Sequence, residues 1–161
     1  MKIFGKTIAE YLAFQKYPLL FVVIVGLGRL CLSLAGTPNS VARWLSITVA
    51  SLLVLVYYSV RIHTSGFGSY LQLLPIHFIQ SLVAQLIVVA GISIAIFTHK
   101  DNVFSAPEFS GGGDGKTWIH AGAHLIIGFT IGPLFGWLLG CALLWVVKRI
   151  VPSQSASRAA A

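Results

Sequence analysis

The chain has 161 residues, of which 57% are hydrophobic and only 9% are charged, and its mean hydropathy is +0.87. Because a soluble globular domain carries about 25% charged residues, this composition argues against a water-soluble protein and indicates a membrane protein. The net charge of +7 comes without a basic run or an aromatic-basic segment, which argues against a nucleic-acid partner.

The first 17 residues mix apolar side chains with the lysines Lys2, Lys6 and Lys16. Such a mixture is typical of an amphipathic segment on a membrane surface, so we predict an interfacial segment over residues 1–17. Proline suits the first position of a helix, where its missing N–H costs nothing. We therefore expect Pro18 to start the first span.

Four apolar stretches follow, each long enough to cross a membrane, which takes roughly 20 helical residues. The predicted spans cover about residues 19–36, 43–62, 74–98 and 118–148. A tail of mostly small residues, 151–161, ends the sequence, and we expect it to be disordered and cytoplasmic. The sequence thus predicts an all-α membrane protein, with a four-transmembrane-helix bundle over residues 18–150 after the N-terminal interfacial segment.

Lysine and arginine are unevenly divided between the two sides of this predicted bundle. Three lie on the side away from the termini: Arg43, Lys100 and Lys116. Because cytoplasmic segments carry the excess of positive charge, we expect a bacterial inner-membrane protein with both termini in the cytoplasm. A cleaved signal peptide is the alternative for the first stretch, but Arg29 interrupts its apolar run. Seven lie on the side of the termini: Lys2, Lys6, Lys16, Arg61, Lys148, Arg149 and Arg158.

The fourth apolar stretch carries glycine at every fourth position. A step of four keeps residues on one ridge of a helix, and a glycine ridge lets another backbone approach closely. We expect this ridge to pack against a second copy of the chain or a larger membrane complex, and Pro133 to kink the helix. The function that it indicates is a non-enzymatic assembly or scaffold role. The glycines are Gly128, Gly132, Gly136 and Gly140.

Two histidines, His120 and His124, stand one helical turn apart at the head of this ridge and can reach one metal ion. A divalent metal needs three or four donors, and the preceding loop offers more of them. The alternative is that both histidines bind interfacial water or loop carbonyls. If they bind a ligand, the chain is a histidine-based haem- or metal-binding membrane protein, serving electron transfer or metal handling. The further candidate donors are His99, Asp101, Glu108 and Asp114.

A polar stripe runs along the third stretch, where His77, Ser81 and Gln85 follow one another at steps of four. His77 lies toward the connection that carries His63, so these two histidines are a candidate haem site. The alternative is that the stripe holds helices together by hydrogen bonds, since buried amides in lipid need partners.

Arg29 lies inside the first predicted span, where an arginine costs about 2.5–3.5 kcal/mol on insertion scales. We expect Glu108, Asp114 or carbonyls of the outer loop to pair with it; the alternative is an anionic headgroup or substrate bound beneath that loop. Arg29, the outer histidines and the loop over residues 98–117 then form one polar site. No predicted span contains a carboxylate, and no serine or cysteine has a plausible base at its depth, so an enzyme is not favoured.

Overall fold

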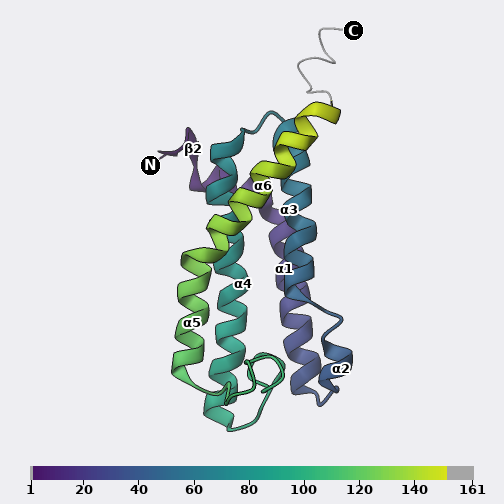
Figure 1. Cartoon of the computed structure of the whole chain (residues 1–161), viewed down its shortest axis with the longest axis vertical. Helices are drawn as coiled ribbons and strands as arrows, with labels where there is room; N and C mark the ends of the chain where they lie inside the picture. The colour runs from purple at the N-terminus through teal and green to yellow at the C-terminus, as the bar shows by residue number, and fades with distance from the viewer. Residues whose placement is uncertain (1, 152–161) are drawn as a thin grey trace.

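The computed structural model describes residues 2–151, and its regular elements are helices except for a short N-terminal hairpin of two strands. Four helical segments are long and apolar enough to cross a membrane: Ile8–Leu34, Asn39–Thr64, Tyr70–Thr98 and Trp118–Ile150. They run side by side along the long axis (Figure 1), so the predicted all-α four-helix membrane bundle is confirmed. The predicted disorder of the tail falls on residues 152–161, outside the described part. The elements are β1 (Lys2–Ile3), β2 (Lys6–Thr7), α1 (Ile8–Leu34), α2 (Asn39–Ala42), α3 (Ile47–Thr64), α4 (Tyr70–Thr98), α5 (Trp118–Phe129) and α6 (Ile131–Ile150).

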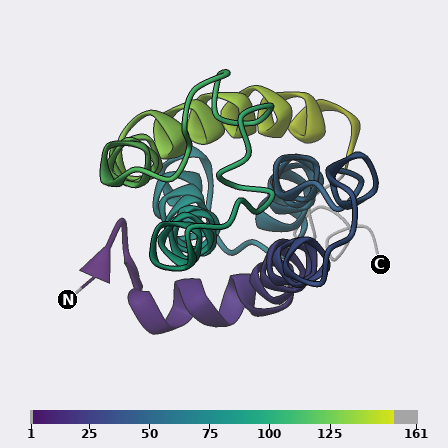
Figure 2. The ribbon, with the colours of Figure 1, turned by 90° about the horizontal axis from the view of Figure 1, so that it is seen from below.

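The bundle has two distinct ends. The hairpin and the end of α6 lie at one end, which we call the termini end, and the loop over residues 99–117 lies with α2 at the other, the loop end (Figure 1). Seen along the axis, that loop crosses the end of the bundle (Figure 2). Helix α4 contacts α1, α3, α5 and α6, so the interior of the bundle is built around it.

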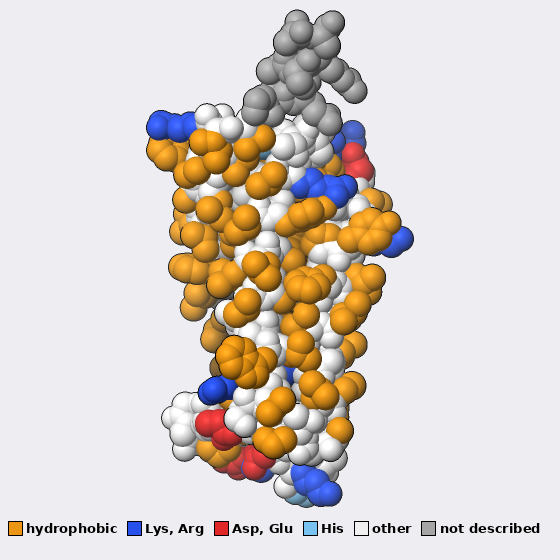
Figure 3. All heavy atoms as spheres, turned by 90° about the vertical axis from the view of Figure 1, so that its right-hand side faces the viewer, with side chains coloured by type: hydrophobic (Ala, Val, Ile, Leu, Met, Phe, Trp, Pro, Cys, Tyr) orange, Lys and Arg blue, Asp and Glu red, His pale blue; other side chains and the backbone are white. Residues whose placement is uncertain are grey.

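Apolar side chains cover the outside of the bundle as well as its interior. Ile126 and Leu138 are 65% and 61% exposed, and the space-filling view shows hydrophobic side chains along the length of the molecule, with the acidic side chains toward its ends (Figure 3). A helix bundle that is apolar all round suits lipid as its surroundings. The interior is filled by large buried side chains: Tyr11, Tyr58, Ile62, Leu73, Ile76 and Ile92.

The first long helix begins ten residues before Pro18. Thr7 and Glu10 form a capping box, in which Glu10 N donates to Thr7 Oγ1 (3.2 Å) and Thr7 N to Glu10 Oε2 (2.8 Å). This box satisfies free amides of the first turn, so the helix starts at Ile8 and Pro18 lies inside it. The first turns of α1 are seen from the side in Figure 2, where its later part is seen nearly end-on. A bend at an internal proline accounts for this change of direction.

The fourth span is divided into two helices at Thr130, whose φ of −121° and ψ of −82° are not helical. Pro133 has no N–H to donate to the carbonyl of Phe129, so the helical hydrogen bonding is interrupted one turn before the proline. The expected kink is therefore a break between α5 and α6. The glycine ridge predicted on one continuous helix lies on both of them.

Candidate functional site

The glycine ridge faces α4 of the same chain. A Cβ atom added to Gly132 would lie 2.6 Å from Ser81 Oγ, and one added to Gly140 would lie 2.8 Å from His77 Nε2. Contacts this short are not tolerated, so the side chains of α4 occupy the space that the glycines leave. The contacting pairs are Gly128 with Gln85, Gly132 with Ser81, and Gly136 and Gly140 with His77.

Within the chain, the ridge is therefore occupied by side chains of α4, and its packing against a second copy or a larger complex stays a prediction. Two stripes face each other here: the glycines of α5 and α6, and His77, Ser81 and Gln85 on α4. Because both repeat every four residues, a glycine meets a polar side chain at successive turns. Polar side chains in a membrane are costly when they face lipid. The glycines give them room between the helices.

His120 and His124 form a close pair on α5. Their Nε2 atoms are 3.2 Å apart, while His120 Nδ1 lies 2.9 Å from Gly115 O and His124 Nδ1 lies 2.8 Å from Gln85 Oε1. Carbonyl oxygens only accept hydrogen bonds, so each Nδ1 donates its proton to one of them. A neutral imidazole has a single N–H, and the two Nε2 atoms therefore present lone pairs to each other. That geometry favours a shared electrophile, either a proton or a metal ion.

The other predicted metal ligands lie elsewhere. His99 ends α4 in a left-handed conformation (φ 55°) and is exposed. Glu108 accepts a hydrogen bond from Asn39 Nδ2 (2.6 Å), which lowers its pKa from the ordinary value. Among the described residues, no group of three or more His, Cys, Asp or Glu side chains is placed to hold a metal ion. The histidine pair thus provides two protein ligands.

The remaining loop carboxylates pair with Lys116, whose Nζ lies 2.7 Å from Asp101 Oδ1 and 3.2 Å from Asp114 Oδ1. The hydrogen bond to Asp101 is the main reason that the pKa of Lys116 is raised. The pKa of Asp114 is lowered, mainly because the backbone N–H of Lys116 donates to its carboxylate. Both aspartates are therefore engaged in exposed ion pairs with Lys116.

Arg29 has aromatic neighbours in place of the expected carboxylate. Its guanidinium carbon lies 5.6 Å from the ring centre of Phe104 and 5.3 Å from that of Phe109, both in the loop. Within residues 2–151, no carboxylate forms an ion pair with Arg29, and its Nε is buried without a hydrogen-bond partner. Cation–π contacts and the loop therefore accommodate this charge. The predicted pairing with Glu108 or Asp114 is wrong.

Arg29 and His124 line the same cavity of about 250 Å³, together with Gln85 and Thr48. The predicted outer polar site thus brings together Arg29 and one histidine directly. The loop contributes apolar walls rather than carboxylates, since Val103, Phe104 and Phe109 complete the lining. Sequence reasoning missed these aromatic residues and the hydrogen bond from His124 to Gln85. His124 stands four residues before Gly128, on the same ridge, and this spacing could have indicated that His124 faces the same neighbouring helix as the glycines.

His63 and His77 do not form the predicted haem site. His63 Nε2 lies 2.9 Å from Val151 O at the end of α6, whereas His77 packs against Gly136 and Gly140. Because a helix rises about 1.5 Å per residue, positions 140 and 151 are about 16 Å apart along α6. One iron cannot bridge that separation.

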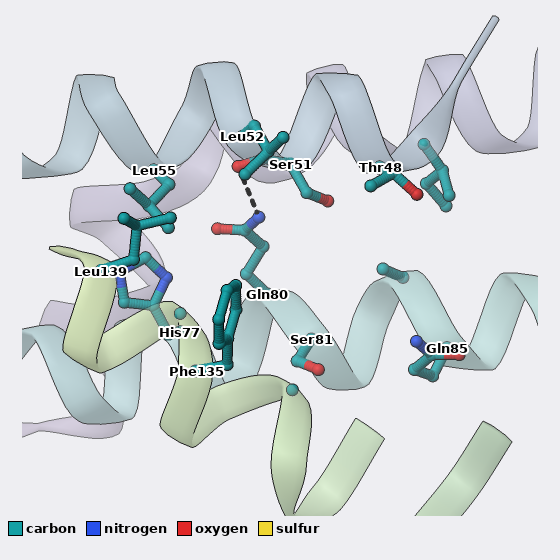
Figure 4. Close-up of a pocket in the computed structure, with 14 residues that line it drawn as sticks. Thr48, Ser51, Leu52, Leu55, His77, Gln80, Ser81, Gln85, Phe135 and Leu139 are labelled. Carbon is teal, nitrogen blue, oxygen red and sulfur yellow. Dashed lines mark hydrogen bonds between the residues drawn. The ribbon is translucent and has the colours of Figure 1, made fainter. Parts of the chain in front are cut away.

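His77 instead lies beside a second cavity, between α3, α4 and α6, which Figure 4 shows with its polar side chains.

Comparison with protein-family models, curated proteins and solved structures finds no match to this chain. The histidine pair and the two cavities are therefore the features from which a function can be argued.

Proposed function

We propose that this is a metal-handling membrane protein that binds a divalent transition-metal ion between the Nε2 atoms of His120 and His124. The observation that carries the proposal is their 3.2 Å separation. Two nitrogens bound tetrahedrally to zinc at about 2.0–2.1 Å lie about 3.3–3.4 Å apart. The pair is therefore already close to the spacing that a shared metal ion requires.

The bonds made by the other ring nitrogens also suit a metal site. A histidine that binds a metal through one nitrogen nearly always donates from the other, often to a carbonyl, which fixes its tautomer and orientation. Gly115 O and Gln85 Oε1 supply such acceptors to His120 and His124. Imidazole ligands suit zinc, copper and nickel.

Two protein ligands leave coordination positions open for water or an exogenous ligand. His124 lines the cavity that also holds Arg29. A ligand that carries negative charge would satisfy both the metal ion and the guanidinium. This combination favours exchange of a metal ion, with an accompanying anion, over permanent structural storage.

Zinc titration of the purified full-length protein in detergent tests the proposal by calorimetry. We expect one equivalent of Zn²⁺ per chain in the wild type, and at least tenfold weaker binding in His120→Ala and in His124→Ala. His99→Ala is the matched control, because His99 is an exposed histidine near the same end of the bundle, and it should bind like the wild type. Binding that is absent in the wild type, or unchanged in both pair variants, would overturn the proposal.

The pH dependence separates a metal ion from a shared proton. Protonated imidazole cannot bind a metal, so zinc affinity should fall as the pH is lowered. Arg29→Gln should leave most of the zinc affinity intact. If the protein instead binds inorganic phosphate more tightly as the pH falls, and Arg29→Gln removes that binding, the pair holds a proton and the metal proposal is wrong.

The finer localisation is also a proposal. The excess of lysine and arginine near the termini supports cytoplasmic termini in a bacterial inner membrane, with the histidine pair on the opposite side. Gly112→Cys, at an exposed loop position, should react with an impermeant thiol reagent added from outside the cell, in a background with Cys31 and Cys141 replaced by serine. Labelling only from the cytoplasmic side would reverse the orientation.

The assembly or scaffold role stays a prediction, as does a homo-oligomer or membership of a larger membrane complex. Its basis was a glycine ridge free to contact a partner. The ridge packs against α4 within the chain, so the structure lends this role no support.

A further inference from the structure

We propose a second, independent site in the middle of the bundle, which binds a small uncharged solute through hydrogen bonds. The site is a cavity of about 250 Å³ between α3, α4 and α6. Figure 4 shows Gln80 and His77 extending from α4 into the space between α3 and α6. The polar side chains that line it are Thr48, Ser51, His77, Gln80, Ser81 and Gln85.

Two of these side chains are buried with unused hydrogen-bonding capacity. His77 is 3% exposed and Gln80 is 5% exposed. Gln80 Nε2 donates to Ser51 O (3.2 Å), but Gln80 Oε1 and His77 Nε2 have no partner within residues 2–151. A buried polar atom without a partner destabilises the folded protein, because it has lost its hydrogen bonds to water. Both atoms belong to side chains that line the cavity, so a bound molecule that reaches them would supply the missing hydrogen bonds.

The charge of the lining identifies the class of ligand. No aspartate, glutamate, lysine or arginine lines the cavity, so an ion inside it would have no countercharge and would pay a large desolvation penalty. A neutral histidine presents one donor and one acceptor, and Gln80 Oε1 is an acceptor. The complementary ligand is therefore neutral, with both donors and acceptors, as in a small amide.

The glycines of α6 make the site possible. The ring of His77 lies over Gly136 and Gly140, where added Cβ atoms would come within 3.2 Å of its Cγ and 2.8 Å of its Nε2. Side chains at these positions would push the imidazole out of its place. Thr48 and Gln85 line both this cavity and the cavity that holds Arg29 and His124. The two cavities are therefore neighbours, and the one with Arg29 lies nearer the loop end.

Acetamide and acetate provide a matched pair of probes, because they have nearly the same shape and differ in charge. The protein, labelled with ¹⁵N-histidine, is stripped of metal with a chelator and titrated with each probe in detergent. We expect acetamide to shift the ring nitrogen signals of His77 saturably, and acetate at neutral pH to leave them unchanged. Equal shifts with both probes, or none with either because the cavity holds only water, would overturn the proposal.

Two variants separate this site from the metal site. Gln80→Met keeps the side-chain length and removes the polar end, and it should weaken acetamide binding at least tenfold. His120→Ala lies outside this cavity and should retain acetamide binding, whether or not the metal proposal holds. Because Gln80→Met could disturb packing, Ser81→Ala serves as a milder second variant and should weaken binding severalfold. Unchanged acetamide binding in both cavity variants would contradict the assignment.

Discussion

At the loop end of the bundle, the Nδ1 atoms of His120 and His124 donate hydrogen bonds while their Nε2 atoms face each other. His77 lies nearer the termini end, as the eighth residue of α4, and has no hydrogen bond to its buried Nε2. The first region is held by bonds to a loop carbonyl and to an amide on α4. The second is held by shape, since glycines leave space for the ring. Both arrangements keep imidazole away from lipid, but the first fixes the orientation of both rings, as the proposed metal site requires. The second leaves hydrogen-bonding capacity for a ligand.

Gln85 connects the two regions. Its Oε1 lies 2.8 Å from His124 Nδ1, its side chain lies against Gly128, and it lines both cavities. Substitutions at the glycines, His77 and Gln85 therefore test how far the two histidine regions differ, and a substitution in the loop provides a further, weaker test.

The largest effect should come from filling the glycine contact. Gly140→Leu would force side-chain atoms into the place of His77, and overpacking of this kind costs about 1–3 kcal/mol or more. We expect a clear drop in Tm in detergent. Gly122→Leu is the control, because nothing lies within 4 Å of a Cβ added there. Equal Tm values for the two variants would mean that the ridge does not pack against α4.

The second prediction tests whether Gly140 exists to seat His77. Gly140→Ala alone should destabilise the bundle, because its Cβ would lie 2.8 Å from His77 Nε2. In a His77→Ala background the same change should cost less, with a coupling free energy of about 0.5–3 kcal/mol for residues in direct contact. A double-mutant cycle of unfolding free energies measures this coupling. Additive effects would separate the glycine from the histidine.

The third prediction uses Gln85 to sharpen the difference between the regions. Gln85→Leu removes the acceptor that orients His124 and should weaken zinc binding about tenfold, at the lower end of the usual 10–100-fold effect of losing such a partner. Gln80→Leu, five residues earlier on α4 and without a hydrogen bond to the pair, is the control for zinc affinity. A zinc affinity as high in Gln85→Leu as in the control would show that this hydrogen bond does not orient the ligand.

The smallest effect should come from the exposed ion pairs of the loop, because solvent and salt screen them. Lys116→Met should lower Tm only slightly, and less at high salt. The lowered pKa of Asp114 means that its contribution is present above the ordinary aspartate value of 3.8 and is lost as the pH falls below it. The raised pKa of Lys116 means that its contribution is present below 10.5 and is lost as the pH rises beyond it. Tm measured against pH for wild type and variant should therefore differ most between these limits, and a larger difference below pH 3 would contradict the assignment.

The amino-acid sequence was sufficient to predict the four spans, since an apolar stretch of roughly 20 residues in lipid must satisfy its backbone by forming a helix. It also identified both four-residue stripes, because helical periodicity places such residues on one face. The position of α1 was less accessible. Pro18 predicts that the first helix starts near residue 18, whereas the capping box of Thr7 and Glu10 starts it at Ile8.

Only the tertiary structure decided which faces meet. Periodicity assigns Gly140 and His77 to faces of their own helices, but it contains no information about which face meets which, so the contact between them was not predicted. The neighbours of Arg29 were undetermined for a related reason. Charge alone favours Glu108 or Asp114, while the path of the loop places Phe104 and Phe109 there. A loop without periodicity is positioned by its tertiary contacts, such as the bond from Val103 N to Ser33 Oγ (2.8 Å), which local sequence does not reveal.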